Sequence, residues 1–145
     1  MKVAQLNEQH IEAMSSIAGS IENCPWRHDA LKKFLDLETS FAWGIFVSNS
    51  LKSFIILQIF EDEAEIMLLV TDPLHRKKKL ATKLLQGILS DTRFTKVERI
   101  FLEVSKQNRA AFEFYQKNGF FIVGQRKNYY VSQNNMDAFV LVRML

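Results

Sequence analysis

The sequence is poor in the residues that fix unusual covalent or backbone structure. Its 145 residues include one cysteine, two prolines and five glycines. A single thiol, Cys24, excludes an internal disulfide and is typical of a reducing compartment. No apolar run approaches the ~20 residues needed to span a bilayer, and no signal-peptide core is visible. No repeat or flexible linker interrupts the chain, so we expect one soluble, cytoplasmic domain over residues 1–145.

Several common catalytic motifs are also missing. The sequence has no G-x-S-x-G nucleophile elbow, no nucleotide-binding phosphate loop and no glycine pattern for dinucleotides. The three histidines and the cysteine lack the spacing of metal ligands; these residues are His10, His28, His75 and Cys24. We therefore expect no metal site and assign them surface or structural roles.

What the chain does contain is typical of a soluble globular protein. Hydrophobic residues make up 48% of it, and twelve phenylalanines predict a well-filled core. The net charge of +3 permits an anionic ligand, but it is too small to indicate nucleic acid by itself. Enzymes and binding modules both remain open on composition alone.

Hydrophobic periodicity predicts the element order β-α-α-β-β-β-α-β-α-β-β, a mixed α/β fold. Strands are expected at residues 2–6, 41–48, 53–60, 63–73 with a stop at Asp72-Pro73, 97–104, 120–130 and 137–145. Helices are expected from the N-cap Asn7 to Ile21, after Trp26, from the basic run to Leu89, and from the N-cap Asn108 to Gly119.

A basic run, HRKKKLATKLL, occupies residues 75–85, directly after a predicted strand and at the start of a predicted helix. Unpaired amides and the helix dipole make such a helix start a site for phosphates. Cations at a helix N-terminus oppose the dipole and cost stability. From the residues alone, the run is a solvated first turn, a nucleic-acid patch or a phosphate-binding turn, and the first interpretation is the simplest.

A carboxylate and a phenol form a second candidate site. Glu103 lies near the end of an otherwise apolar strand, where partial desolvation raises the pKa of a carboxyl toward that of a general base. Tyr115 lies on the next helix and could donate a proton. The alternative is an exposed strand residue and a core aromatic, and it is favoured for each residue alone.

Three segments together resemble the GNAT acetyltransferases. They are DEAEIMLLVTDPLHRKKKLATKLL (62–85), FLEVSKQNRAAFEFYQKNGF (101–120), and RKNYY (126–130) followed by DAFVLVRML (137–145). The chain is most similar to the RimI type, which acetylates N-terminal amines of proteins, including a ribosomal protein. The resemblance implies a GNAT fold, in which helices cover both faces of a twisted, mostly antiparallel sheet of about seven strands. Acetyl-CoA would lie in the splay between the central strands.

The resemblance also implies residues that bind the cofactor. Three strand residues would bind acetyl-CoA through their backbone, one amide polarising the thioester carbonyl; they are Leu69, Val70 and Thr71. The turn and first helical residues would hold the pyrophosphate on backbone amides; they are Arg76, Lys77, Lys78, Lys79, Leu80, Ala81 and Thr82. Asn108 would contact the pantetheine arm or a phosphate.

For catalysis, the resemblance implies direct transfer in a ternary complex, without a metal and without Cys24 as nucleophile. Glu103 would deprotonate the acceptor amine through water, and Tyr115 would protonate the CoA thiolate. An N-terminal α-amine, with a pKa near ~8, is deprotonated more easily than a lysine side chain near ~10.4. Residues 24–26 and 128–130 would border the acceptor cleft, or are ordinary core residues.

One position departs from the family pattern Q/R-x-x-G-x-G/A. Arg76 and Ala81 match its first and last positions, but Lys79 stands where the glycine belongs. Glycine tolerates backbone conformations that lysine rarely adopts. The departure leaves open a working turn with altered CoA binding or a non-catalytic CoA-binding or protein-binding module. A small-molecule amine is the alternative acceptor.

Overall fold

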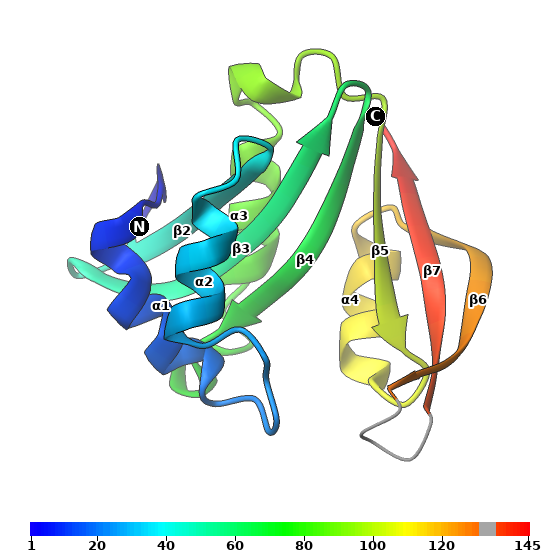
Figure 1. Ribbon diagram of the computed structural model, residues 1–145, viewed down its shortest axis with the longest axis horizontal. Coiled ribbons are helices and arrows are strands. Elements are labelled where there is room, and N and C mark those ends of the chain that lie inside the picture. The colour runs from blue at the N-terminus through cyan, green and yellow to red at the C-terminus, as the bar shows by residue number, and fades with distance from the viewer. Residues whose placement is uncertain (131–135) are drawn as a thin grey trace. The chain divides into compact units, whose positions relative to one another are not determined.

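The computed structural model describes residues 1–130 and 136–145, and the side chains of 1–127 and 137–145. The strands are β1 (Lys2–Gln5), β2 (Ser40–Val47), β3 (Ser50–Phe60), β4 (Glu63–Thr71), β5 (Arg99–Ser105), β6 (Phe121–Tyr130) and β7 (Met136–Met144). The helices are α1 (Ile11–Ala18), α2 (His28–Leu35), α3 (Leu80–Ile88) and α4 (Arg109–Lys117) (Figure 1). The expected order of helices and strands is confirmed.

The strands form one mixed sheet in the order β1-β2-β3-β4-β5-β7-β6. Most pairings are antiparallel, and β4 and β5 are parallel. The chain divides into two compact units, Met1–Phe60 with Ile66–Thr95 and Glu61–Glu65 with Lys96–Leu145, called the first and second unit below. The single domain expected from the sequence stays a prediction. No helix in the described part of the chain is long and apolar enough to cross a membrane.

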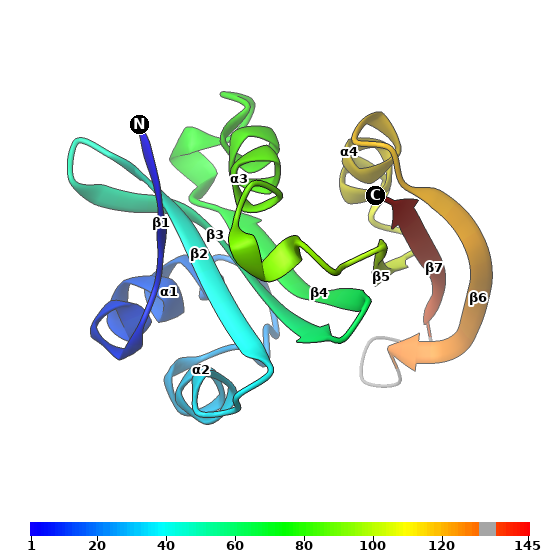
Figure 2. The same ribbon diagram turned by 90° about the horizontal axis from the view of Figure 1, so that it is seen from above.

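In the first unit, helices cover both faces of the sheet. Figure 2 shows α1 and α2 on one face of β1–β4 and α3 on the other. Strands β2 and β3 form a hairpin through a two-residue turn at Ser48 and Asn49, with φ of 52° and 64°. Two positive φ values are typical of a type I′ turn, which matches the twist of the strands. Strand β3 therefore begins at Ser50, three residues earlier than the strand 53–60 expected from the sequence.

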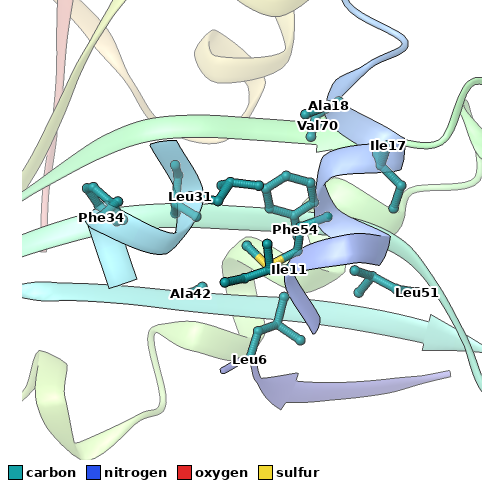
Figure 3. Close-up of a cluster of buried hydrophobic side chains, with 12 residues drawn as sticks. Leu6, Ile11, Ile17, Ala18, Leu31, Phe34, Ala42, Leu51, Phe54 and Val70 are labelled. Atoms are coloured by element: carbon teal, nitrogen blue, oxygen red, sulfur yellow. The ribbon is translucent and has the colours of Figure 1, made fainter. Parts of the chain in front are cut away.

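The core of the first unit lies between the sheet and the α1–α2 layer (Figure 3). Alternate strand residues face this layer because side chains along a strand point to opposite faces. The core residues are Leu6, Ile11, Met14, Ile17, Ala18, Leu31, Phe34, Ala42, Leu51, Phe54, Ile56 and Val70. Helix α3 also buries an apolar stripe at helical spacing, Leu80, Leu84, Leu85 and Ile88.

The first helix differs from the prediction at both ends. Asn7 caps a 3₁₀ turn over Glu8–His10, which leads directly into α1, and its side chain accepts a hydrogen bond from the amide of Gln9. Helix α1 ends at Ala18, so the prediction that Ile21 is helical was wrong. Gly19 follows as the C-cap and the chain leaves the helix there, although Ile21 still packs against the core.

In the second unit, β5 pairs with the first three residues of β4 on one side and with β7 on the other. Its residues alternate, with Ile100, Leu102 and Val104 buried and the residues between them half-buried. Helix α4 packs on β7 through Phe112, whose ring centroid lies 5.2 Å from that of Phe139. This alternation fixes which β5 side chains are accessible to a ligand.

Candidate functional site

The end of β4 is held firmly by its neighbour β3. The hydroxyl of Ser53 donates a hydrogen bond to the Val70 carbonyl at 2.9 Å and lies 2.9 Å from the Thr71 hydroxyl. The amide of Asp72 donates to the Lys52 carbonyl at 2.7 Å. These bonds fix the backbone of Leu69–Thr71, which the sequence predicted as a cofactor-binding strand end. Ser53 was not among the predicted residues.

Asp72 organises the chain where the strand ends. Its Oδ1 accepts a hydrogen bond from the amide of Leu74 at 3.0 Å, which starts a 3₁₀ turn over Pro73–His75. Its Oδ2 lies 3.8 Å from the ammonium of Lys52 and 3.9 Å from Nδ1 of His75. Asp72 therefore fixes the direction in which the basic run leaves the sheet.

The basic run is an exposed turn with an unusual backbone. Lys77 and Lys79 both have positive φ, 62° and 61°, and Lys79 adopts the left-handed conformation with ψ of 22°. The lysine that replaces the motif glycine thus takes a glycine-like backbone conformation. Leu80, the next residue, is helical. A left-handed residue followed by a right-handed one turns successive amides toward the same side, which forms an anion-binding concavity.

Helix α3 begins directly after this turn and lacks a side-chain cap. Lys79 is its N-cap residue and makes no capping hydrogen bond through its side chain. The first helical bond runs from the amide of Lys83 to the carbonyl of Lys79, so the helix does not pair the amides of Leu80, Ala81 and Thr82. Unpaired amides, the helix dipole and exposed lysines all favour a bound anion. The residues present therefore fit a pyrophosphate group.

In the second unit, the candidate base Glu103 forms an ion pair that the sequence did not reveal. Its side chain is 20% exposed, and its Oε2 lies 3.2 Å from Nη1 of Arg126 on β6. The β7 residues opposite Glu103 and Arg126 are Val140 and Ala138, two positions apart, so both charged side chains lie on one face of the sheet. The strand sequence suggested apolar surroundings for Glu103. In the structure, the guanidinium of Arg126 lies beside it as well.

A second carboxylate, Glu65, faces the same side. Glu65 pairs in register with Phe101 on β5, and Glu103 is two residues further along that strand. Burial raises the pKa of Glu65, and the charge of Glu103 raises it further, whereas Arg126 acts in the opposite direction. Sequence reasoning missed Glu65. The alternation of residues along β4 was a sequence signal for Glu65, because it places Glu63 and Glu65 on one face of the strand.

The two remaining site candidates lie on or beside α4. Tyr115 is 7% exposed, and its ring centroid lies 5.3 Å from that of Phe120. Asn108 is the N-cap of α4, and its side-chain oxygen accepts a hydrogen bond from the amide of Ala111 at 3.2 Å. Because that oxygen serves the helix, the amide nitrogen of Asn108 is the group best placed to contact a ligand.

The predicted site residues fall into two sets. Leu69–Thr71 and Arg76–Thr82 belong to the first unit, whereas Glu103, Asn108 and Tyr115 belong to the second. Within each set the structure brings the residues onto neighbouring elements. Among the described residues, no group of three or more His, Cys, Asp or Glu side chains is arranged to hold a metal ion.

Two segments were predicted to border the acceptor cleft, and the structure describes the side chains of one of them. In the first, Cys24 and Trp26 pack partly buried against the core, and the Trp26 ring lies edge-on to Phe34 with centroids 5.1 Å apart. This packing matches the alternative of an ordinary core aromatic. In the second, the side chains of residues 128–130 lie outside the described residues.

Comparison with known proteins places these features in a family. The model of the acetyltransferase (GNAT) family matches residues 11–120. The [ribosomal protein bS18]-alanine N-acetyltransferase of Salmonella typhimurium is 30% identical over 94 residues, which cover 64% of each chain. The match thus spans just under two thirds of that relative. The enzyme of the same description from Haemophilus ducreyi is 27% identical over 128 residues, covering 85% of this chain and 84% of its own.

The fold agrees with a solved structure over nearly the whole chain. The crystal structure of the ribosomal-protein-S18-alanine N-acetyltransferase from Escherichia coli superposes with a TM-score of 0.89, covering 99% of this chain and 92% of that chain. The sequence identity in this superposition is 23%, so it supports the fold and no finer conclusion. The predicted fold, a mostly antiparallel seven-stranded sheet with helices on both faces, is confirmed.

Proposed function

The chain belongs to the acetyltransferase (GNAT) family, and on that premise we propose that it transfers the acetyl group of acetyl-CoA to the N-terminal α-amine of a protein. The observation that carries the proposal is the conformation of Lys79. Its backbone is left-handed, a conformation that glycine adopts readily, and the amides of Leu80, Ala81 and Thr82 follow without a side-chain cap. This conformation supports a turn that binds acetyl-CoA in an active enzyme. It is less consistent with the alternative, a protein that has kept the fold but lost catalytic activity.

In this proposal the first unit binds acetyl-CoA. The pyrophosphate is held on the backbone amides of the turn and first helical residues, Arg76–Thr82, and the lysines add attraction for the phosphates. The backbone of Leu69–Thr71 hydrogen-bonds the acyl end, and one amide there stabilises the oxyanion that forms on the thioester carbonyl. Ser53 holds the strand end in place by its bond to Val70.

The second unit supplies the proton-transfer groups. Glu103, through a water molecule, takes one proton from the acceptor ammonium, and the freed lone pair attacks the thioester carbonyl. The C–N bond forms as the carbonyl opens to the oxyanion; when the carbonyl re-forms, the C–S bond breaks and Tyr115 protonates the departing thiolate. The phenolate then regains a proton from the still protonated nitrogen of the new amide. The balance is one amide, one CoA thiol and one proton released to solvent through Glu103.

A protein N-terminus is the favoured acceptor because of the relatives. Two of them carry the description [ribosomal protein bS18]-alanine N-acetyltransferase, and a ribosomal protein is accordingly part of the proposal. An α-amine also has the lower pKa of the two amines that proteins offer, which eases its deprotonation by a carboxylate. A cytoplasmic location, expected from the lone cysteine, belongs to the same proposal.

The test is a transfer assay with the purified chain. Acetyl-CoA is supplied with a panel of peptides that differ in their first residue, together with N-terminally blocked lysine peptides and small polyamines. We expect acetylation of one or more free N-termini, identified by mass spectrometry of the peptide. Transfer to polyamines alone would replace the acceptor by a small molecule, and binding of acetyl-CoA without transfer to any amine would contradict the enzymatic proposal.

A further inference from the structure

Most carboxylates on the strands of the second unit have a cationic partner. Arg99 Nε donates to Glu63 at 2.8 Å, and its Nη2 lies 3.3 Å from Asp62. Glu103 pairs with Arg126. Glu65 differs, because within the described residues it makes no hydrogen bond and no ion pair, although it is half-buried. A half-buried carboxylate without a partner costs stability, and a bound cation would offset that cost.

The geometry places Glu65 next to the candidate base. Residues two apart on a strand share a face, so Phe101 and Glu103 lie on the same side of β5. Glu65 is opposite Phe101 in the parallel register and points to this side as well. The two carboxylates are close enough for their charges to interact, and Arg126 interacts with both. With Glu65 and Glu103 ionised, the group of three carries one uncompensated negative charge.

We propose that Glu65 binds the ammonium form of the acceptor amine and holds it beside Glu103, which then takes the proton. The inference rests on the proposed function, since it assigns Glu103 the role of base. Glu65 is a positioning residue that contacts the acceptor and undergoes no net change in the reaction. The ammonium neutralises the excess charge, so the site selects cationic primary amines and discriminates against neutral or acidic acceptors.

The arrangement also separates two tasks that one carboxylate performs poorly. A carboxylate that holds an ammonium tightly stabilises the charged amine, which opposes deprotonation. With two carboxylates, Glu65 supplies the attraction while Glu103 accepts the proton. Arg126 fixes the Glu103 side chain and limits the repulsion between the two acids, as its effect on Glu65 indicates.

Binding without turnover tests the inference directly. The probes are a synthetic pentapeptide with a free N-terminal alanine and the same peptide with a propionyl group in place of that alanine, titrated into the protein saturated with CoA. CoA carries no acetyl group, so no transfer occurs. We expect wild-type protein to bind the amine peptide about tenfold more tightly than the propionyl peptide, and Glu65→Gln to lose this preference.

Glu63→Gln is the matched control. Glu63 lies two residues earlier on the same strand and face, but its charge is paired with Arg99. We expect this variant to keep the wild-type preference for the amine peptide. Equal binding of the two peptides by wild-type protein, or an unchanged preference in Glu65→Gln, would overturn the inference.

Steady-state kinetics give a second measurement and separate this inference from the proposed function. In Glu65→Gln we expect the KM for the amine peptide to rise about tenfold while the KM for acetyl-CoA stays unchanged, and Glu65→Asp should recover part of the loss. If wild-type protein acetylates the peptide and Glu65→Gln has the wild-type KM, the inference alone fails. If wild-type protein acetylates no amine, the proposed function fails, and the inference fails with it.

Discussion

The guanidinium of Arg126 on β6 lies 3.2 Å from Oε2 of Glu103 on β5, although β7 separates the two strands in the sheet. Two elements far apart in the sequence thus fix one carboxylate. The long side chain of Arg126 reaches across β7, where the residues on this face are the small Ala138 and the aliphatic Val140. The candidate base is therefore held in place by its ion pair as well as by its strand.

The first prediction concerns Glu103 as the base. Glu103→Gln keeps the size of the side chain and removes its ability to accept a proton. We expect kcat to fall about a hundredfold or more, the usual contribution of a general base, with the dissociation constant for acetyl-CoA unchanged. Glu113→Gln, an exposed acid on α4, is the control and should keep wild-type kcat. A wild-type rate in Glu103→Gln would remove the assignment.

The second prediction concerns Tyr115 as the acid. Tyr115→Phe retains the ring that packs on Phe120 and removes only the hydroxyl. We expect kcat to fall about a hundredfold at neutral pH. The defect should shrink above about pH 9, because a thiolate whose conjugate acid has a pKa near ~8.5 then leaves without a proton. The pH profile of kcat checks this, and a defect that is the same at every pH would indicate a structural role.

Much of the fold could be predicted from the sequence because local patterns and tertiary packing agree. Asn108 and Gly119 bound a helix in sequence and in structure, and Gly119 has the positive φ of 88° expected after a helix end. The Asp72-Pro73 stop was also placed correctly. Ile21 was misplaced because its apolar spacing continues the helical pattern, whereas the backbone leaves the helix at Gly19.

The candidate site was predicted only in part, because its electrostatics depend on long-range pairing. The motif residues near Lys79 and Glu103 were visible as a pattern along the chain. Arg126 and Glu65 were not, since each meets Glu103 through the register of other strands, and nothing local marks that register. The left-handed backbone of Lys79 was likewise hidden, because lysine does not favour it.

The third prediction concerns the coupling among these charges. Glu103 raises the pKa of Glu65 and Arg126 lowers it. Glu103→Gln should therefore lower the pKa of Glu65, and Arg126→Gln should raise it. The carboxyl ¹³C resonance of Glu65, followed through a pH titration, measures both shifts. Shifts in the same direction in the two variants would show that the three groups do not interact as the structure indicates.

The fourth prediction concerns how the raised pKa of Glu65 makes the stability of the fold depend on pH. An acid whose folded-state pKa is raised binds more protons when folded. The protonated Glu65 side chain therefore stabilises the folded state. This contribution to the free energy of unfolding is complete below the unfolded-state pKa near 4.5 and is lost as the pH rises through the folded-state pKa. Glu65→Gln should therefore gain stability relative to wild type as the pH rises from 4 to 7. Urea unfolding at both pH values measures the change.

Glu63→Gln serves as the control for the charge of Glu65. Glu63 pairs with Arg99 at 2.8 Å, so its replacement removes a favourable ion pair. At pH 7 this variant should be less stable than wild type, whereas Glu65→Gln should not be. A loss of stability in both variants at pH 7 would contradict the assignment of Glu65 as the uncompensated acid.

The last prediction concerns Lys79 in the place of glycine. The left-handed conformation costs a non-glycine residue about 1–2 kcal/mol, and glycine itself loses about 0.5–1 kcal/mol through the greater entropy of its unfolded chain. Lys79→Gly should therefore leave stability unchanged or raise it by up to about 1.5 kcal/mol. Lys78→Gly removes the same charge from a residue whose φ is not positive, and it should lower stability by about 0.4–1 kcal/mol.

Because the turn keeps its shape, Lys79→Gly should bind acetyl-CoA at least as tightly as Lys78→Gly, as measured by calorimetry. Weaker binding by Lys79→Gly would show that the Lys79 ammonium contacts a phosphate, and that the lysine has replaced the glycine as a ligand as well as in backbone shape.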